Sequence, residues 1–117
     1  MDIFDKCVIH DDMTIDCLAS VYLNRKNLKK LPEFIQFNVA KNHFSISENR
    51  LLDSLRGCPY IVDGYFSCSD NALTSLKDCP KIVKQSFFCG NNKKKFTNED
   101  VKKYCKITDN RWIELGN

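Results

Sequence analysis

Residues 64–83 read GYFSCSDNALTSLKDCPKIV, and many of these residues recur 21 positions earlier or later in the chain. The pairs that share this offset include Cys58 and Cys79, Cys68 and Cys89, Phe66 and Phe87, and Asn71 and Asn92. Self-similarity with a period of about 20–29 residues is typical of solenoids built from short stacked repeats. The sequence therefore predicts a chain that winds in coils of about 21 residues.

The most regular copy of the repeat shows what each position does. It reads Phe66-x-Cys68-x-x-Asn71-x-Leu73-x-x-Leu76, followed by Cys79-Pro80-x-Ile82-Val83. The apolar-x-apolar pair predicts a short strand with two side chains on one face. The asparagine ends that strand, and we expect its amide to bond the backbone of neighbouring coils. The two leucines point inward from the returning arm, and the proline marks its bend.

The remaining copies follow the same pattern with local departures. They are Val21-x-Leu23-x-x-Lys26-x-Leu28-x-x-Leu31 followed directly by Pro32-x-Phe34-Ile35, then Phe44-x-Ile46-x-x-Asn49-x-Leu51 with Leu55 one residue late, and finally Phe87-x-Cys89-x-x-Asn92, which breaks at Lys93. One such coil cannot bury its apolar edge, whereas stacked coils cover each other. We therefore expect repeats over 15–95, with about four strands in one parallel sheet.

This framework resembles the leucine-rich-repeat family, whose L-x-x-L-x-L-x-x-N/C-x-L pattern matches from Phe66 through Leu73 with aromatic and cysteine substitutions. Residues 64–83 and the ending CGNNKKKFTNEDVKKYCKI also resemble short repeat proteins encoded by tailed bacteriophages. The resemblance spans about Ile15 to Ile107. It implies a leucine-rich-repeat-like α/β solenoid in a single domain, 1–117. It also implies an accessory protein that binds and inhibits a bacterial host or defence factor in the host cytoplasm.

Both ends of a solenoid need covering, so terminal segments are usually atypical. We expect residues 1–14 to form an N-terminal cap and residues 96–117 a C-terminal cap made of a helix and strands. Thr97 is the expected N-cap, with Asp100 at the third helical position. The apolar side chains expected to cover the N-terminal end are Phe4, Cys7, Val8 and Ile9, and those at the C-terminal end are Val101, Tyr104 and Cys105. A strand at Ile107, a turn at Asp109-Asn110 and a strand at Trp112-Ile113 should follow.

Composition excludes several classes of protein. A hydrophobic fraction of 43% is too high for a disordered chain. Eighteen Lys and Arg against 15 Asp and Glu leave a net charge of +3, too small by itself to indicate nucleic-acid or membrane binding. No stretch approaches the roughly 18 apolar residues of a membrane span, and residues 1–6 lack a signal-peptide pattern. We expect a cytoplasmic protein with no membrane association.

The seven cysteines form no C-x-x-C pair, which removes the commonest zinc and redox signatures. Solenoid geometry places them in columns, whereas a zinc site needs four ligands converging tetrahedrally. We expect reduced, buried thiols, no metal and no cofactor.

The sequence predicts no enzyme. His10 and His43 are the only histidines, and nothing in the spacing places either of them as the base of a nucleophile. The glycines are isolated, so no phosphate-binding loop is present. A pocket at one end of the solenoid is the alternative that would allow catalysis.

The outward strand positions are the candidate binding surface, because they alternate with the buried ones. They are Ser20, Tyr22 and Asn24; His43, Ser45 and Ser47; Tyr65, Ser67 and Ser69; and Ser86, Phe88 and Gly90. We expect aromatic anchors for a protein partner at Tyr22, His43, Tyr65 and Phe88, with polar contacts from Ser45, Ser67 and Ser86. Alternatively, serine merely tolerates exposure on these strands, and Tyr65 and Phe88 cover each other.

Two other functions stay open at this point. A nucleic-acid binder would use lysine clusters, above all Lys93, Lys94, Lys95, Lys102 and Lys103, although neighbouring acidic residues interrupt the positive field. A structural protein would pair its open sheet edge with another copy. We expect a monomer or a weak homo-oligomer.

Overall fold

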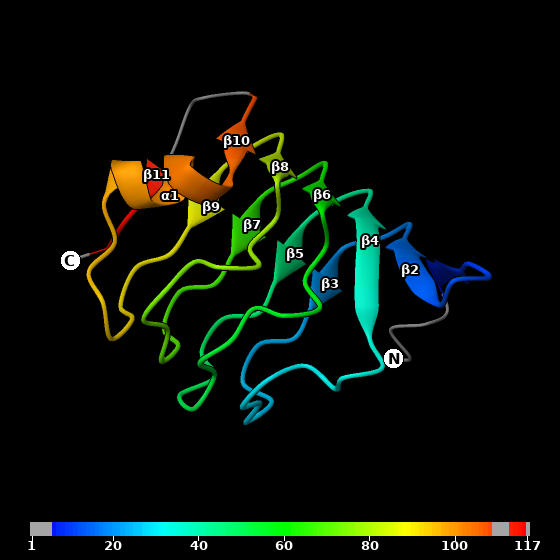
Figure 1. Ribbon diagram of the computed structural model, residues 1–117, viewed down its shortest axis with the longest axis horizontal. Helices are drawn as coiled ribbons and strands as arrows, with labels where there is room; N and C mark the ends of the chain where they lie inside the picture. The colour runs from blue at the N-terminus through cyan, green and yellow to red at the C-terminus, as the bar shows by residue number, and fades with distance from the viewer. Residues whose placement is uncertain (1–5, 109–112, 117) are drawn as a thin grey trace.

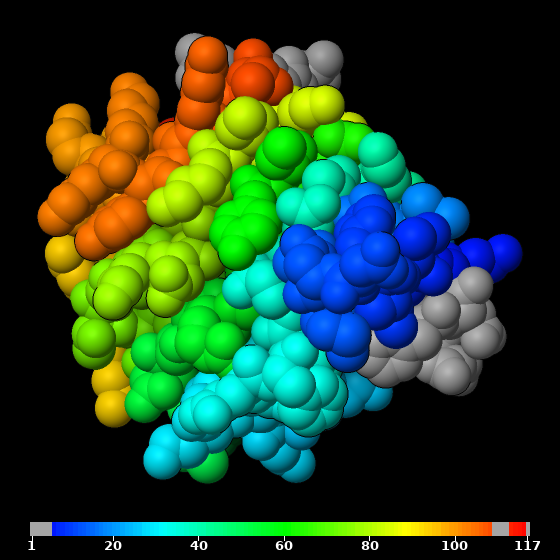
Figure 2. All heavy atoms as spheres, turned by 45° about the vertical axis from the view of Figure 1, so that its right-hand side comes forward, coloured from blue at the N-terminus to red at the C-terminus, as the bar shows by residue number. Residues whose placement is uncertain are grey.

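The computed structural model describes residues 6–108 and 113–116, in which the chain forms a β-solenoid. It winds about four turns, and each turn adds one short strand to each of two sheets (Figure 1). Figure 2 shows successive coils as bands that run side by side across the surface, from blue through green to orange. The predicted stack of coils is confirmed.

The two sheets meet at a corner of each coil. The first sheet has the order β1 (Cys7–Ile9), β2 (Thr14–Cys17), β4 (Gln36–Ala40), β6 (Ile61–Val62), β8 (Ile82–Val83) and β10 (Lys106–Ile107). The second contains, in chain order, β3 (Val21–Tyr22), β5 (Phe44–Ser45), β7 (Phe66–Ser67), β9 (Phe87–Phe88) and β11 (Ile113–Glu114). All neighbouring strands are parallel except β1 and β2.

The prediction of one parallel sheet in an α/β solenoid is therefore wrong in two respects. The apolar pair after each proline, such as Ile82-Val83, forms a strand of its own instead of a bend. The returning arms are turns and bends, so the only helix in the described residues is α1 (Asn98–Tyr104). The described residues therefore form a β-solenoid with few helices.

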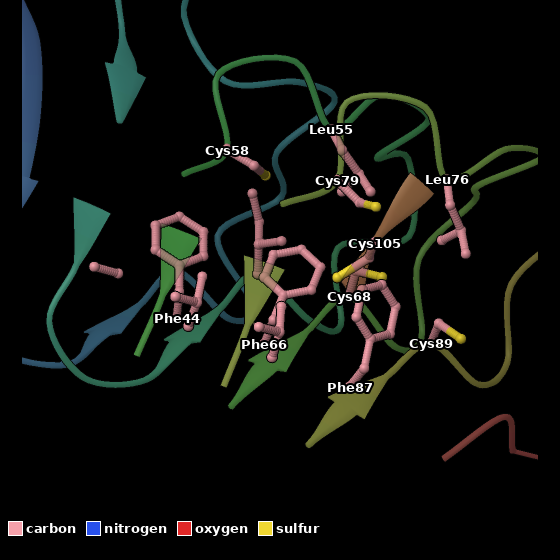
Figure 3. Close-up of a cluster of buried hydrophobic side chains, with 14 of the residues drawn as sticks. Phe44, Leu55, Cys58, Phe66, Cys68, Leu76, Cys79, Phe87, Cys89 and Cys105 are labelled. Carbon is pink, nitrogen blue, oxygen red and sulfur yellow. The ribbon is translucent and has the colours of Figure 1, made fainter. Parts of the chain in front are cut away.

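The phenylalanines form a column through the core. Phe44 pairs in register with Phe66, and Phe66 with Phe87. All are fully buried, and their ring centroids lie 6.2 Å and 5.2 Å apart along the column. Figure 3 shows the rings side by side on neighbouring strands. Each coil therefore covers the apolar edge of the next, as the repeat predicts.

An asparagine ladder runs parallel to this column. The Asn71 Nδ2 donates to the carbonyls of Ile46 (2.8 Å) and Cys68 (2.9 Å), and its Oδ1 accepts from the N–H of Asn49 (2.8 Å). The side chains of Asn49 and Asn92 bridge neighbouring coils in the same way. The predicted bonds between asparagine amides and adjacent coils are confirmed.

The irregular first and second coils differ from the predicted pattern. Leu51 was expected inside but is 65% exposed, and Leu52 is fully buried in its place, so the inserted residue precedes Leu52. Phe34 is 79% exposed, because the strand of this coil begins only at Gln36. Val39, rather than Phe34, pairs with Ile61.

The N-terminal segment also differs from its expected role. Val8 and Ile9 are exposed, because β1 extends the first sheet sideways as a hairpin with β2 instead of folding over the first coil. Cys7 does pack against the core. Phe4 lies outside the described residues.

Helix α1 forms as the sequence predicts. The Thr97 side chain accepts from the N–H of Asp100, and the Asp100 side chain accepts from the N–H of Thr97, which is a capping box. Val101 is fully buried in the core and Cys105 follows as the C-cap. The strands expected at Ile107 and Ile113 are present, whereas Asp109, Asn110 and Trp112 lie outside the described residues. Within residues 6–108 and 113–116, no helix has the length and apolar character that a bilayer crossing requires.

The inward thiols lie where the repeat places them. Cys68 and Cys89 are buried in the core, and Cys58 and Cys79 are buried one coil apart (Figure 3). Burial raises the pKa of Cys89 to about 12, and it raises the pKa values of Cys58 and Cys68 well above their ordinary value of 9.0. These thiols therefore stay protonated in the folded chain at neutral and mildly alkaline pH.

We expect the free energy of unfolding to fall as the pH rises above about 9, by on the order of 1 kcal/mol per pH unit for each such thiol. The unfolded chain releases thiol protons near pH 9 while the folded chain retains them, so the unfolded state binds fewer protons. Urea denaturation of the reduced protein at a series of pH values measures this slope. Cys58→Ala should lose less stability over the same interval than the parent chain, and an equal loss would contradict the explanation.

Candidate binding surface

The outward face of the second sheet has a gap in one column of side chains. Because Phe44 and its equivalents point inward, the next residue of each strand points outward. Successive partners in this outward column are Tyr22, Ser45, Ser67 and Phe88. Two small serines thus separate two large aromatic residues.

The gap forms a shallow hollow of about 430 Å³, which we call the serine hollow. Buried serines form its floor; its aromatic lining residues are called the aromatic side and its carboxylates the acidic side. The residues that line it are Asn24, Ser45, Ser47, Glu48, Tyr65, Ser67, Ser69, Asp70 and Phe88. The sequence-predicted residues Ser45, Tyr65, Ser67 and Phe88 therefore come together in one place.

The floor of the serine hollow is held by its own hydrogen bonds. The Ser45 Oγ donates to Asn24 Oδ1 (2.8 Å), and the Oγ atoms of Ser47 and Ser67 lie 2.6 Å apart. Ser45 and Ser67 were expected on an exposed face, but they are only 4% and 9% exposed. These hydroxyls therefore form a fixed floor at the bottom of the hollow.

The aromatic side is built from stacked rings. The rings of His43 and Tyr65 are stacked with centroids 4.0 Å apart, and Phe88 meets Tyr65 edge-on at 5.6 Å. The Tyr65 N–H donates to His43 Nδ1 (3.0 Å), and burial lowers the pKa of His43, so the imidazole is neutral at physiological pH. A Cβ at Gly64 would collide with this nitrogen, which explains the glycine there.

The aromatic side extends to the first coil. Burial raises the pKa of the Tyr65 hydroxyl, and its hydrogen bond with Tyr22 adds to the shift. Tyr22 itself is half exposed. The alternative that Tyr65 and Phe88 cover each other holds in part, since their rings touch while both still line the serine hollow.

The acidic side was missed by the sequence reasoning. Glu48 and Asp70 both take left-handed backbone conformations, with φ of 59° at each. The Glu48 carboxylate pairs with Arg25, at 2.6 Å from its Nε, and the Asp70 Oδ1 accepts from the Asn91 amide (2.9 Å). An available signal was the acidic residue directly before the ladder asparagine in two successive repeats, Glu48-Asn49 and Asp70-Asn71.

The other predicted contact residues lie outside the serine hollow. Ser86 is partly buried, and its carbonyl accepts from the Phe66 N–H. The lysines proposed for nucleic-acid contact are Lys93, Lys94 and Lys95 in the loop before α1, and Lys102 and Lys103 on α1. They are exposed, and Lys94 pairs with Asp100 at 3.3 Å.

Outside the serine hollow, the described residues place one histidine beside a carboxylate. His10 Nε2 lies 2.9 Å from Asp16 Oδ2 on the β1–β2 hairpin. In the described part of the chain, no group of three His, Cys, Asp or Glu side chains is arranged to hold a metal ion. A comparison with protein-family models, with curated proteins and with solved structures finds no match to this chain.

Proposed function

We propose that the protein is a non-enzymatic protein-binding module that docks a partner on the serine hollow and its aromatic side. The observation that carries this proposal is the pairing of aromatic side chains, Tyr65 and Phe88, with a floor of hydroxyls that is already hydrogen-bonded. Aromatic anchors beside polar contacts are the usual composition of protein interfaces.

Rigidity supports the same role. Stacking on His43 and the backbone hydrogen bond to its Nδ1 hold Tyr65 before any partner arrives. The floor serines are fixed by their bonds to Asn24 and to each other. Ordering a side chain on binding costs about 0.5–1.5 kcal/mol, so a preformed surface leaves more of the contact energy for affinity.

We also infer, from the resemblance to phage-encoded repeat proteins, that the partner is a bacterial host or defence factor whose activity is blocked by binding in the host cytoplasm. The asparagine ladder supports a leucine-rich-repeat-like assignment, because that family places an asparagine at the end of each strand. In the same proposal 96–117 serves as the C-terminal cap, which the burial of Val101 supports, whereas β1, from the segment 1–14 expected to form the N-terminal cap, lies at the edge of the first sheet.

Capture from bacterial lysate tests the docking proposal. The immobilised protein should retain a partner that the double variant Tyr65→Ala with Phe88→Ala releases, with at least about tenfold weaker binding, because truncating an aromatic anchor costs about 2 kcal/mol or more. Phe88→Ser is a milder variant, since serine occupies the same column at Ser45 and Ser67.

Tyr60→Ala is the matched control, because Tyr60 is 45% exposed and lies outside the serine hollow. Circular dichroism and urea midpoints establish that each variant is folded. Undiminished capture by a folded Phe88→Ser protein and by the double variant would refute docking at this surface.

A further inference from the structure

We propose that the serine hollow receives a cationic side chain of the partner, an arginine or lysine, with Asp70 as its counter-charge. This inference rests on the proposed function and deepens it, because it names the chemistry of the group that the surface recognises. The argument starts from the charges around the hollow.

The two carboxylates of the hollow differ in whether a positively charged side chain contacts them. Glu48 is neutralised by Arg25, which contacts both carboxylate oxygens at 2.6 Å and 3.3 Å. Asp70 accepts only from the neutral amide of Asn91. Across residues 6–108 and 113–116, no Lys, Arg or His side chain makes an ion pair with Asp70. Asp70 is therefore the carboxylate of the hollow that no cationic side chain of the described residues contacts directly, although Arg25 and Arg50 line an adjoining depression together with it.

The remaining surface of the hollow also suits a cation. The Ser47 and Ser67 hydroxyls form one hydrogen bond with each other, and Ser47 also accepts from Ser45 at 3.4 Å, which leaves acceptor lone pairs on the floor. Tyr65 and Phe88 supply aromatic rings to the lining of the same hollow as Asp70. A cation over an aromatic ring gains about 0.5–2 kcal/mol, and a guanidinium offers several donors to a carboxylate and to hydroxyls at once.

Other occupants fit this surface less well. An acidic side chain would meet the Asp70 charge and be repelled. An apolar side chain would cover Asp70 and displace its water without replacing the lost hydrogen bonds, which is costly for a charged group. A cationic side chain is the class of occupant that compensates the carboxylate and uses the aromatic side.

A pair of small probes tests this inference without knowledge of the partner. We expect N-acetyl-arginine methylamide to shift the backbone amide signals of the ¹⁵N-labelled protein around Ser67 and Asp70, with saturation at millimolar concentration. The neutral isostere N-acetyl-citrulline methylamide should bind at least about fivefold more weakly, because its urea carries no positive charge and cannot form an ion pair with the Asp70 carboxylate. Equal binding of the two probes would overturn the proposal.

Asp70→Asn supplies the decisive variant. Asparagine tolerates the left-handed backbone of this position and keeps an Oδ1 acceptor for Asn91, so the fold should be unaffected. Affinity for the arginine probe should fall about fivefold to tenfold. Asp53→Asn removes the same charge from an exposed position outside the hollow and should leave affinity unchanged. An unchanged affinity in Asp70→Asn would also overturn the proposal.

The outcomes separate this inference from the proposed function. If binding of the arginine probe depends on Asp70 while lysate capture is unchanged by Tyr65→Ala with Phe88→Ala, the cation site is supported and the docking role is refuted. Capture that depends on Tyr65 and Phe88 but is the same for Asp70→Asn and the parent protein would keep the docking surface and remove the cationic occupant.

Discussion

Replacing Phe66 by alanine is expected to lower the free energy of unfolding by about 3–5 kcal/mol. Phe66 is the central ring of the column, fully buried, with Phe44 on one side and Phe87 on the other. Truncation removes its own apolar contacts and also uncovers the facing edges of both neighbouring rings. A domain of this size has a total stability of about 5–15 kcal/mol, so the variant should be close to unfolding.

Urea denaturation followed by circular dichroism measures this loss. Phe34→Ala is the matched control, because it is the same substitution at a ring that is 79% exposed, and we expect a change within about 0.5 kcal/mol there. If the two substitutions cost the same, the phenylalanine column would not be the main support of the stack.

The period of the repeat was sufficient to predict the stack and the residues at its centre. Apolar residues at fixed offsets have to form columns when coils stack, so the sequence alone predicts that Phe66 and Phe87 lie in one column, as they do. The second sheet was missed because a two-residue apolar pair, such as Ile61-Val62, has too little alternation to distinguish a strand from a bend.

Local register was harder to predict than the repeat itself. A single inserted residue moves the buried position from Leu51 to Leu52, and both are leucines, so composition cannot separate them. In the first coil the pair Phe34-Ile35 follows a proline just as Ile61-Val62 does, yet β4 begins later, at Gln36. Only the pairing of β4 with β6 decides between these registers.

The candidate site was predicted in part for the same reasons. Alternation along a strand was enough to place Tyr65, Ser67 and Phe88 on the outward face. The alternation of inward and outward side chains ends with the strand. Glu48 and Asp70 follow the strands, at residues with left-handed backbone conformations, so the alternation does not predict where their side chains point. Burial of the floor serines depends on the size of neighbours in adjacent coils, which a single repeat does not contain.

Asn71→Ala is expected to lower the free energy of unfolding by about 2–4 kcal/mol, a smaller loss than that expected for Phe66→Ala. The substitution leaves the Ile46 carbonyl without its amide donor, the Cys68 carbonyl with the Asn92 amide alone (3.1 Å), and the Asn49 N–H without its acceptor. These groups lie between coils, where water does not replace the lost bonds. Asn98→Ala is the control, because Asn98 is exposed on α1 and alanine favours the helix.

Asn71→Asp separates the donor role of the amide from its acceptor role. The carboxylate still accepts from the Asn49 N–H, but it donates nothing to the two carbonyls and places a negative charge beside them. We expect a loss at neutral pH at least as large as that of alanine. Protonation restores one donor, so the stability difference from the parent chain should shrink as the pH is lowered toward about 4. A difference that stays constant with pH would mean that the amide hydrogens do not hold adjacent coils together.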